Sequence, residues 1–180
     1  MSIDFEVASG ALVGVKIITP SVFEEARGNI WTSYRDEELA ALLPDGLRFK
    51  HDKFSESRAN VLRGIHGDHK SWKLVTCVWG EIHQVVADMR ENSKTYLGFE
   101  RHLINRQNQK LILIPPGMGN AYFVSAPGAV YHYKLAYEGD YIDADDQFTV
   151  AWDDPRLNID WPTRDPILSA RDAEARYGSD

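Results

Sequence analysis

The chain has few of the features that membrane and disulfide-rich proteins need. Its 180 residues include a single cysteine, Cys77, which lies in the apolar run LVTCVW. One thiol can build neither a disulfide framework nor a thiolate zinc site within a chain, so we expect Cys77 in the core. No stretch approaches the roughly 20 apolar residues of a membrane helix, and the start MSIDFEVASG lacks a signal-peptide pattern. These absences predict a cytoplasmic protein.

Positive charge is also scarce. The 20 Lys and Arg against 27 Asp and Glu give a net charge of −7, which argues against general nucleic-acid binding. The basic residues are concentrated, however: Arg48 to Lys73 holds seven against three acidic residues, whereas Ala136 to Asp180 holds four against twelve. The basic segment predicts a site for a small anion, although a solvated charged surface gives the same count.

The middle of the chain reads as β-structure. Short runs rich in β-branched and aromatic residues, separated by Gly, Pro or Asn, occupy 72–79, 81–89, 110–114, 121–125 and 129–137. Many short strands at close spacing predict a sandwich or a barrel. Since repeats and linker-like segments are lacking, residues 1–180 are expected to form a single domain.

Two helices are expected outside the strands. In DEELAALLPDG, Asp36 is the predicted cap, and Leu39, Leu42 and Leu43 form an apolar stripe. The segment LSARDAEARYG predicts a terminal helix that begins with a capping box at Ser169.

The segment VLRGIHGD places an arginine and a histidine among glycines, so the backbone can bring both side chains close to a ligand. Arg63 suits a phosphate and His66 suits a proton. For a lone histidine, a buried neutral imidazole with one hydrogen bond is the commoner role.

Strand alternation sorts the side chains of two predicted strands. In AVYHYKLAY, Tyr131 and Tyr133 share one face, and His132 and Lys134 share the other. By themselves the tyrosines favour aromatic packing, in which each hydroxyl finds some hydrogen-bond partner.

The same parity in EIHQVVADM groups Gln84, Val86 and Asp88, with His83 facing away. Asp88 on a largely apolar face needs a cation or donors, and Lys73 is a candidate partner.

A metal site is one alternative. His66, Asp68 and His132 would mimic the two-histidine, one-carboxylate triad of oxygenases. Two observations count against it: Asn120 stands where a metal-binding cupin places a histidine, and parity separates His132 from Tyr133.

The sequence resembles the dTDP-4-dehydrorhamnose 3,5-epimerase family over nearly its whole length. The matching pieces, in order, are FEEARG, FSESRANVLRGIHGD, WKLVTCVWGEIHQVVADMR, IPPGMGNAYFV, VYHYKLAY, AWDDPRLNIDWP and LSARD. The resemblance implies an all-β double-stranded β-helix, that is a cupin or jelly-roll barrel, with short peripheral helices. It further implies a homodimer with exchanged N-terminal strands, a nucleotide-diphosphate sugar as substrate, and no metal or organic cofactor.

Carried over residue by residue, the resemblance implies His66 as general base, Tyr133 as general acid and Asp172 as the carboxylate partner of the histidine. Lys73 matches the lysine beside the 4-keto oxygen of the substrate, and Asp88 its buried carboxylate neighbour. Asp172 also has a simpler role open to it, because it lies where it would complete the capping box of Ser169.

The resemblance also implies a substrate-binding set, in which Arg27 and Arg63 match diphosphate-binding arginines. The full set is Arg27, His51, Lys53, Ser55, Arg63, Asp88, Asn120 and Arg171.

The chain departs from the family pattern where nucleotide and phosphates are expected. The loop from His66 to Lys73 is shorter than usual, Asn120 replaces a histidine, and His51 and Lys53 replace a glutamine and an asparagine. The motifs GIHGD and KLVTCVWGEIHQVV are similar to those of a subgroup of the family. That subgroup acts on GDP-linked 4-keto-6-deoxy heptoses for capsule or surface polysaccharide.

These features predict epimerisation at C3, at C5 or at both carbons of a 4-keto-6-deoxy sugar linked to dTDP or GDP. The alternatives are a metal-dependent cupin oxygenase, a 3,4-ketoisomerase, and a non-catalytic cupin that binds a sugar nucleotide.

Overall fold

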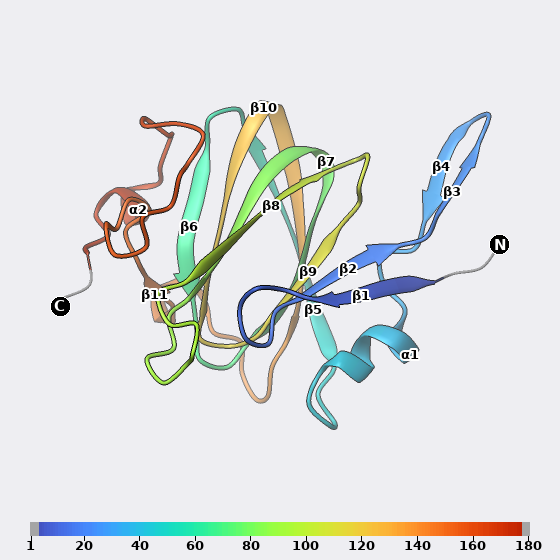
Figure 1. Cartoon of the computed structure of the whole chain (residues 1–180), viewed down its shortest axis with the longest axis horizontal. Coiled ribbons are helices and arrows are strands. Elements are labelled where there is room, and N and C mark those ends of the chain that lie inside the picture. Colours follow the sequence, from blue (N-terminus) through green and yellow to red (C-terminus); the bar gives the residue numbers. More distant parts are fainter. Residues whose placement is uncertain (1–3, 178–180) are drawn as a thin grey trace.

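The protein folds as a jelly-roll barrel with short helices outside it, as the resemblance implied. The computed structural model describes residues 4–177 (Figure 1). Nine of its strands form one curled sheet with the path β1-β2-β9-β7-β10-β6-β11, while β5 pairs with β10 and β8 with β7. The bounds of these strands are β1 Phe5–Ser9, β2 Lys16–Pro20, β5 Phe49–Arg58, β6 Leu62–Gly67, β7 Trp72–Asp88, β8 Phe99–Asn105, β9 Leu111–Ile114, β10 Met118–Ala136 and β11 Phe148–Thr149.

The two long antiparallel strands β7 and β10 hold the barrel together. Their register runs from Met118 opposite Asp88 to Ala136 opposite Trp72, with an interruption between Val124 and Ala129. Strand β7 covers both predicted runs 72–79 and 81–89, and Gly80 is the residue between them. Gly80 has φ +80°, and a Cβ atom on it would lie 2.1 Å from the carbonyl oxygen of Gly128 on β10. A glycine is therefore required where the two strands turn together.

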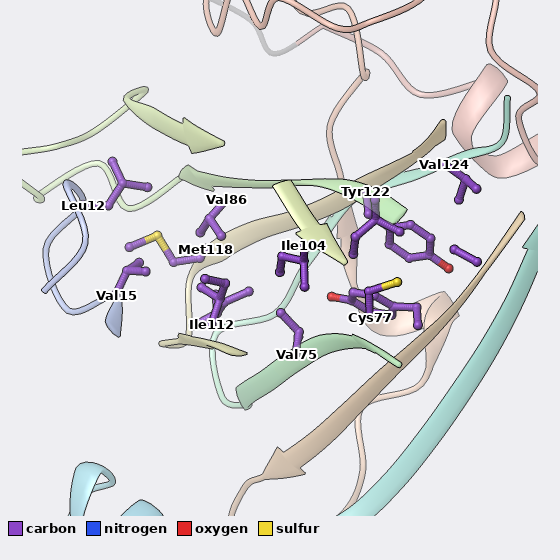
Figure 2. Packing of buried hydrophobic residues seen from close by; sticks show 14 residues of the cluster. Leu12, Val15, Val75, Cys77, Val86, Ile104, Ile112, Met118, Tyr122 and Val124 are labelled. Atoms are coloured by element: carbon purple, nitrogen blue, oxygen red, sulfur yellow. The ribbon is translucent and has the colours of Figure 1, made fainter. Parts of the chain in front are cut away.

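Apolar side chains on the inner faces form a continuous core. One cluster includes Cys77, Ile104, Ile112 and Met118, each 3% exposed or less. Figure 2 shows this cluster between the strands, with Leu12 at one end and Val124 at the other. The prediction that Cys77 is a small core residue is confirmed.

The first predicted helix is present but is capped differently. It consists of α1, Asp36–Leu39, and a 3₁₀ turn, Ala40–Leu42. The expected cap is wrong: Arg35 holds the N-cap position without a side-chain cap bond, because the Asp36 carboxylate is engaged by Tyr34 and Arg48. The apolar stripe is confirmed, since Leu39 is 1% exposed and packs in the core.

The terminal helix is much shorter than expected. The observed helix is α2, Ala170–Ala173, and the residues directly before it form no helix. Gly178, the last residue of the predicted segment, lies outside the described residues. The cap is confirmed, because the Ser169 hydroxyl accepts a hydrogen bond from the Asp172 backbone N–H at 3.2 Å.

A separate two-stranded hairpin, β3 Val22–Glu25 and β4 Gly28–Trp31, extends away from the barrel (Figure 1). Phe23 and Ile30 face each other across this hairpin, and each is about half exposed, at 46% and 48%. No helix within residues 4–177 is long and apolar enough to span a membrane.

The corner at Gly80 gives a stability prediction. Gly80→Ala should lower the free energy of unfolding by about 1 to 3 kcal/mol for the left-handed backbone and by a further ~1 to 3 kcal/mol for the clash with Gly128. Gly46→Ala is the matched control, because Gly46 has φ +79° but nothing within 4 Å of an added Cβ. Urea unfolding of both variants separates the two contributions; equal losses would show that the close approach of β7 and β10 costs nothing.

Candidate active site

One cavity of about 320 Å³ opens between β5, β6, β7 and β10 on one side and the segments around β11 and α2 on the other. Its size is near the lower end of the usual range for ligand sites. Sixteen residues line it: Lys53, Ser55, Arg63, His66, Lys73, Asn120, Tyr122, Tyr131, Tyr133, Tyr141, Asp143, Ala144, Gln147, Ser169, Arg171 and Asp172. The four residues expected to be catalytic are all among them.

His66 and Asp172 form a hydrogen-bonded pair at the wall of the cavity. The Nε2 atom of His66 lies 2.5 Å from Oδ1 of Asp172, whose carboxylate is 2% exposed. The Gly64 backbone N–H also approaches this carboxylate, at 3.4 Å from Oδ2. Burial raises the pKa of Asp172, but the bond to His66 and that from Ser169 outweigh it, so the pKa is lowered. The carboxylate is therefore ionised and directed at the imidazole, in addition to the backbone role of its residue in the helix cap.

The glycines beside His66 let β6 lie against β10. A Cβ on Gly64 would come within 2.6 Å of the Ala121 side chain, and one on Gly67 within 2.3 Å of the Met118 carbonyl oxygen. Because these contacts are too short for any side chain, the glycines set the position of His66 opposite Asn120 in the sheet.

Tyr133 enters the same cavity from β10. Its ring lies 5.7 Å from that of Tyr131, which is buried and stacks on Tyr122 at 4.2 Å. Burial raises the pKa of Tyr133, against the lowering effect of Lys53 and Arg63. The phenol is thus protonated at neutral pH and can donate a proton. The parity prediction is confirmed, because His132 and Lys134 both bind Asp52 on the outer face.

Lys73 is buried at the start of β7, but its partner is not the expected one. The ammonium lies 3.4 Å from Oδ2 of Asp68. The prediction that Asp88 is its neighbour is wrong: Asp88 ends β7 and accepts hydrogen bonds from Arg90, Ser93 and Thr95. The grouping of Asp88 on the inner face is correct, since it is 0% exposed, but its charge is satisfied by the turn that follows it.

Most of the expected substrate-binding residues line the cavity. Five do so directly, and these are Lys53, Ser55, Arg63, Asn120 and Arg171. His51 is next in line on the same face of β5, and its ring lies 4.7 Å from that of the lining residue Tyr141. The basic segment seen in the sequence therefore supplies cations to one site.

Arg27 lies away from the cavity of its own chain. It occupies the turn of the β3–β4 hairpin, where it pairs with Glu25 and its side chain is 82% exposed. It does not line the cavity, so a role at this site would require a second copy of the chain.

The alternative metal triad is not assembled. His132 points to the outer face of β10, where its Nε2 lies 2.9 Å from Asp52, so it cannot join His66 and Asp68. Among residues 4–177, no group of three His, Cys, Asp or Glu side chains is arranged to hold a metal ion.

Sequence reasoning missed part of the lining. Tyr122 and Tyr131 form an aromatic wall of the cavity. The sequence indicated the direction of Tyr131, because this residue lies on the same face of its strand as Tyr133. The loop residues Tyr141, Asp143 and Gln147 had no such signal, because irregular chain carries no periodicity.

The fold is a jelly-roll barrel, and comparison with known proteins gives the class of the protein. A family model for dTDP-4-dehydrorhamnose 3,5-epimerase matches residues 9–179. The enzyme of that name from Salmonella typhimurium is 31% identical over 173 residues, covering 94% of this chain and 93% of the relative.

Two solved structures extend the comparison. The dTDP-6-deoxy-D-glucose-3,5-epimerase of Legionella pneumophila, in complex with dTDP-4-keto-L-rhamnose, superposes with a TM-score of 0.88 at 30% identity, covering 97% of this chain and 93% of that one. A 4-keto-6-deoxy sugar epimerase from the novobiocin biosynthetic gene cluster of Streptomyces spheroides has the same TM-score and identity, covering 97% and 87%. The chain belongs to the dTDP-4-dehydrorhamnose 3,5-epimerase family and is an isomerase of the sugar-nucleotide 3,5-epimerase type.

The correction at Asp88 is testable. Burial raises the pKa of Asp88, but the hydrogen bonds from Arg90, Ser93 and Thr95 lower it well below its usual range. Its stabilising contribution is therefore fully present above the unfolded pKa of about 3.9 and is lost as the pH falls through the lower folded value. Asp88→Asn should cost about 3 to 5 kcal/mol at pH 7, because the Arg90 charge loses its partner.

Thermal unfolding from pH 7 down to pH 2 checks this. The gap in Tm between wild type and Asp88→Asn should narrow towards acid pH, while the exposed control Asp45→Asn stays within error of wild type. An unchanged Tm with a raised KM would instead place Asp88 in substrate binding.

Proposed function

We propose that the protein epimerises a 4-keto-6-deoxy sugar linked to a nucleoside diphosphate, at C3, C5 or both, in deoxy-sugar biosynthesis. The observation that carries the proposal is the meeting of the His66–Asp172 pair, the Tyr133 phenol and the Lys73 ammonium in one cavity. A base, an acid and a donor for negative oxygen are the three groups that such a reaction needs.

In this proposal His66 is the base, and the contact of its Nε2 with Asp172 supports Nδ1 as the reacting atom. Since Nε2 is engaged by the Asp172 carboxylate, neutral His66 carries its proton there, and its lone pair lies on Nδ1. That atom takes the proton from the carbon beside the keto group, while Asp172 stabilises the imidazolium that forms. Base catalysis of this kind contributes roughly a hundred- to ten-thousand-fold.

Lys73 supports the step by stabilising the enolate. The electrons released at the carbon move to the 4-keto oxygen, and a cation within hydrogen-bond reach lowers the energy of the resulting oxyanion. Losing one preorganised donor of this type typically raises the barrier by about 2.7 to 4 kcal/mol.

Tyr133 completes the inversion. A proton returned to the same face regenerates substrate, so the acid must lie across the ring from His66. Tyr133 comes from a different strand and is protonated at neutral pH, which fits this role.

Hydrogen exchange in heavy water tests the assignment. His66→Asn should lose both exchange and product, because no proton leaves the carbon. Tyr133→Phe should retain exchange into the substrate while forming at least ~100-fold less inverted product, because the enolate is then reprotonated only from the original face. NMR of the sugar reads the carbon that gains deuterium and its configuration. Full exchange in His66→Asn would show that the assigned base is wrong.

The nucleotide is part of the same experiment. The names of the Salmonella typhimurium and Legionella pneumophila relatives contain dTDP, whereas the resemblance implies other residues at the positions of His51, Lys53 and Asn120. Assays with both dTDP- and GDP-linked 4-keto-6-deoxy sugars, hexose and heptose, therefore define the substrate. Movement of the keto group itself would instead indicate a ketoisomerase, and binding without exchange a non-catalytic cupin.

The proposed function includes a homodimer in which the N-terminal segments are exchanged. The exposed pair Phe23 and Ile30 on the projecting hairpin supports it, because such a pair is stabilised when a second copy covers it. Arg27 at the hairpin turn would then be carried to the cavity of the partner.

This arrangement predicts that Arg27→Ala changes KM but not kcat. KM for the nucleotide sugar should rise about tenfold or more with kcat nearly unchanged, because the arginine contacts the phosphates and not the reacting carbon. The double variant Phe23→Ser, Ile30→Ser should be monomeric by light scattering and show the same rise in KM. A monomeric wild type, or an Arg27→Ala enzyme with unaltered KM, would contradict the proposal.

A further inference from the structure

The burial of Lys73 raises a question of charge. Its side chain is 9% exposed, and an ammonium in such a place loses its proton readily unless an anion stays close. Burial lowers the pKa of Lys73, the positive charge of Arg171 lowers it further, and Asp68 raises it. Other charged or titratable groups that line the cavity with Lys73 are Lys53, Arg63, His66, Tyr122, Tyr131, Tyr133, Tyr141, Asp143 and Asp172. The Asp172 carboxylate is bonded to His66, so Asp68 is the anion that lies against the ammonium.

Asp68 is held rigidly in the turn between β6 and β7. Its Oδ1 accepts hydrogen bonds from the backbone N–H groups of Lys70 and Ser71, at 2.9 and 2.5 Å. Its backbone carbonyl accepts another from the Gly117 N–H at 2.7 Å, which ties the turn to the start of β10. With Oδ1 fixed in this way, Oδ2 is directed at Lys73.

The geometry of Oδ2 fits a counter-ion and not a full hydrogen-bond partner. This oxygen is buried and has no hydrogen-bond donor among the described residues; its 3.4 Å approach to Lys73 is an ion-pair distance. Charge-assisted hydrogen bonds are shorter, about 2.7 to 2.9 Å. Because the contact is loose, the N–H groups of Lys73 remain available to a substrate oxygen.

We propose that Asp68 is the positioning residue of the lysine, which keeps Lys73 protonated and directed into the cavity and so sets the upper pH limit of enolate formation. The proposal rests on the proposed function, in which Lys73 stabilises the enolate oxygen. It assigns to Asp68 the part that sequence comparison gave to Asp88.

The sign of the effect follows from the active form. Lys73 acts when protonated, so exchange activity falls as the pH rises through its pKa. Removing the Asp68 charge lowers that pKa, and the alkaline limb should move to lower pH by about one unit or more, the usual effect of one opposite charge at this range. At a pH between the alkaline limb of the variant and that of wild type, hydrogen exchange by the variant should be about tenfold slower than by wild type.

Asp68→Asn is the informative variant. An asparagine oxygen can still accept the N–H bonds of Lys70 and Ser71, so the turn is kept while the charge is removed. The measured quantity is the rate of hydrogen exchange into substrate in heavy water as a function of pH. Exchange is chosen because proton removal needs Lys73 but not Tyr133. Asp68→Glu, which keeps the charge, should bring the limb back towards that of wild type, even if the rate at its plateau is lower.

Two controls separate the possible failures. Asp154→Asn removes another buried carboxylate that binds a backbone N–H, outside the cavity, and should leave the limb in place. Lys73→Met should abolish exchange; if it does not, the proposed role of the lysine fails. If Lys73→Met is inactive but the limbs of Asp68→Asn and wild type coincide, the inference about Asp68 alone is overturned.

A direct titration covers the case in which Asp68→Asn is too unstable to assay. NMR of ¹³C-labelled lysine reports the pKa of Lys73 in the resting enzyme, with Lys73→Arg used to assign its signal. Asp68→Glu should leave this pKa within about half a unit of wild type, because the charge remains, whereas Asp68→Asn or Asp68→Ser should lower it. An unchanged Lys73 pKa in a folded, uncharged variant contradicts the proposal.

Discussion

The antiparallel pairing of β7 with β10 is the constraint on which the rest of the structure depends. The two strands run together from one end of the barrel to the other, so each inward side chain of one is placed against the other by register. Side chains alternate between the two faces of a strand, and for that reason Tyr131 and Tyr133 enter the cavity while His132 faces outward to Asp52. A slip by one residue would exchange the two sets. The geometry of the candidate site and the closure of the barrel are thus consequences of the same hydrogen bonds.

Those parts of the site that follow from periodicity were predictable from the sequence. The alternation of β10 gave the inward tyrosines, and the glycines of VLRGIHGD indicated that a backbone there approaches another closely. The Ser169 cap was also readable, because capping is a contact between residues three apart. The family resemblance added what local patterns do not contain, namely that segments far apart in the sequence meet in one place, as His66 and Asp172 do across 106 residues.

The parts that failed depend on turns. Asp88 was matched to a distant lysine, but a chain that reverses directly after it brings Arg90 to its carboxylate, and a partner two residues away costs little ordering. Asp68 lies in the turn that precedes β7, whereas Asp88 is the last residue of that strand, and no periodic pattern marks the direction of a turn residue. The helix cap at Asp36 failed for a similar reason, since Tyr34 and Arg48 compete for the same carboxylate. The errors at Asp88 and Asp36 each concern a carboxylate with more than one candidate partner.

Asn120 stands where the resemblance implies a histidine, and this has a consequence for the charge of the site. The Asn120 Oδ1 atom accepts from Gln84 Nε2 at 2.7 Å and from the Tyr131 hydroxyl at 3.2 Å, which fixes the orientation of the amide. Gln84 cannot be reversed without loss, because its Nε2 also donates to the Ala121 carbonyl at 3.0 Å. The Asn120 NH₂ group is thereby left as a donor in a residue that lines the cavity.

That donor carries no charge and does not titrate, whereas a histidine at the same position would add a second imidazole beside His66, its neighbour across the strand pair. A protonated imidazole there would oppose the formation of a charged His66 during catalysis, by the ordinary repulsion of like charges at short range. A neutral amide adds no positive charge beside His66, whose Nε2 is paired with the Asp172 carboxylate. The positive charge of the reacting region is then supplied by Lys73 and by the arginines that line the cavity, Arg63 and Arg171, and the carboxylates of Asp68 and Asp172 each restrain one group. The candidate site therefore contains two anchored carboxylates, Asp172 against the His66 imidazole and Asp68 against the Lys73 ammonium.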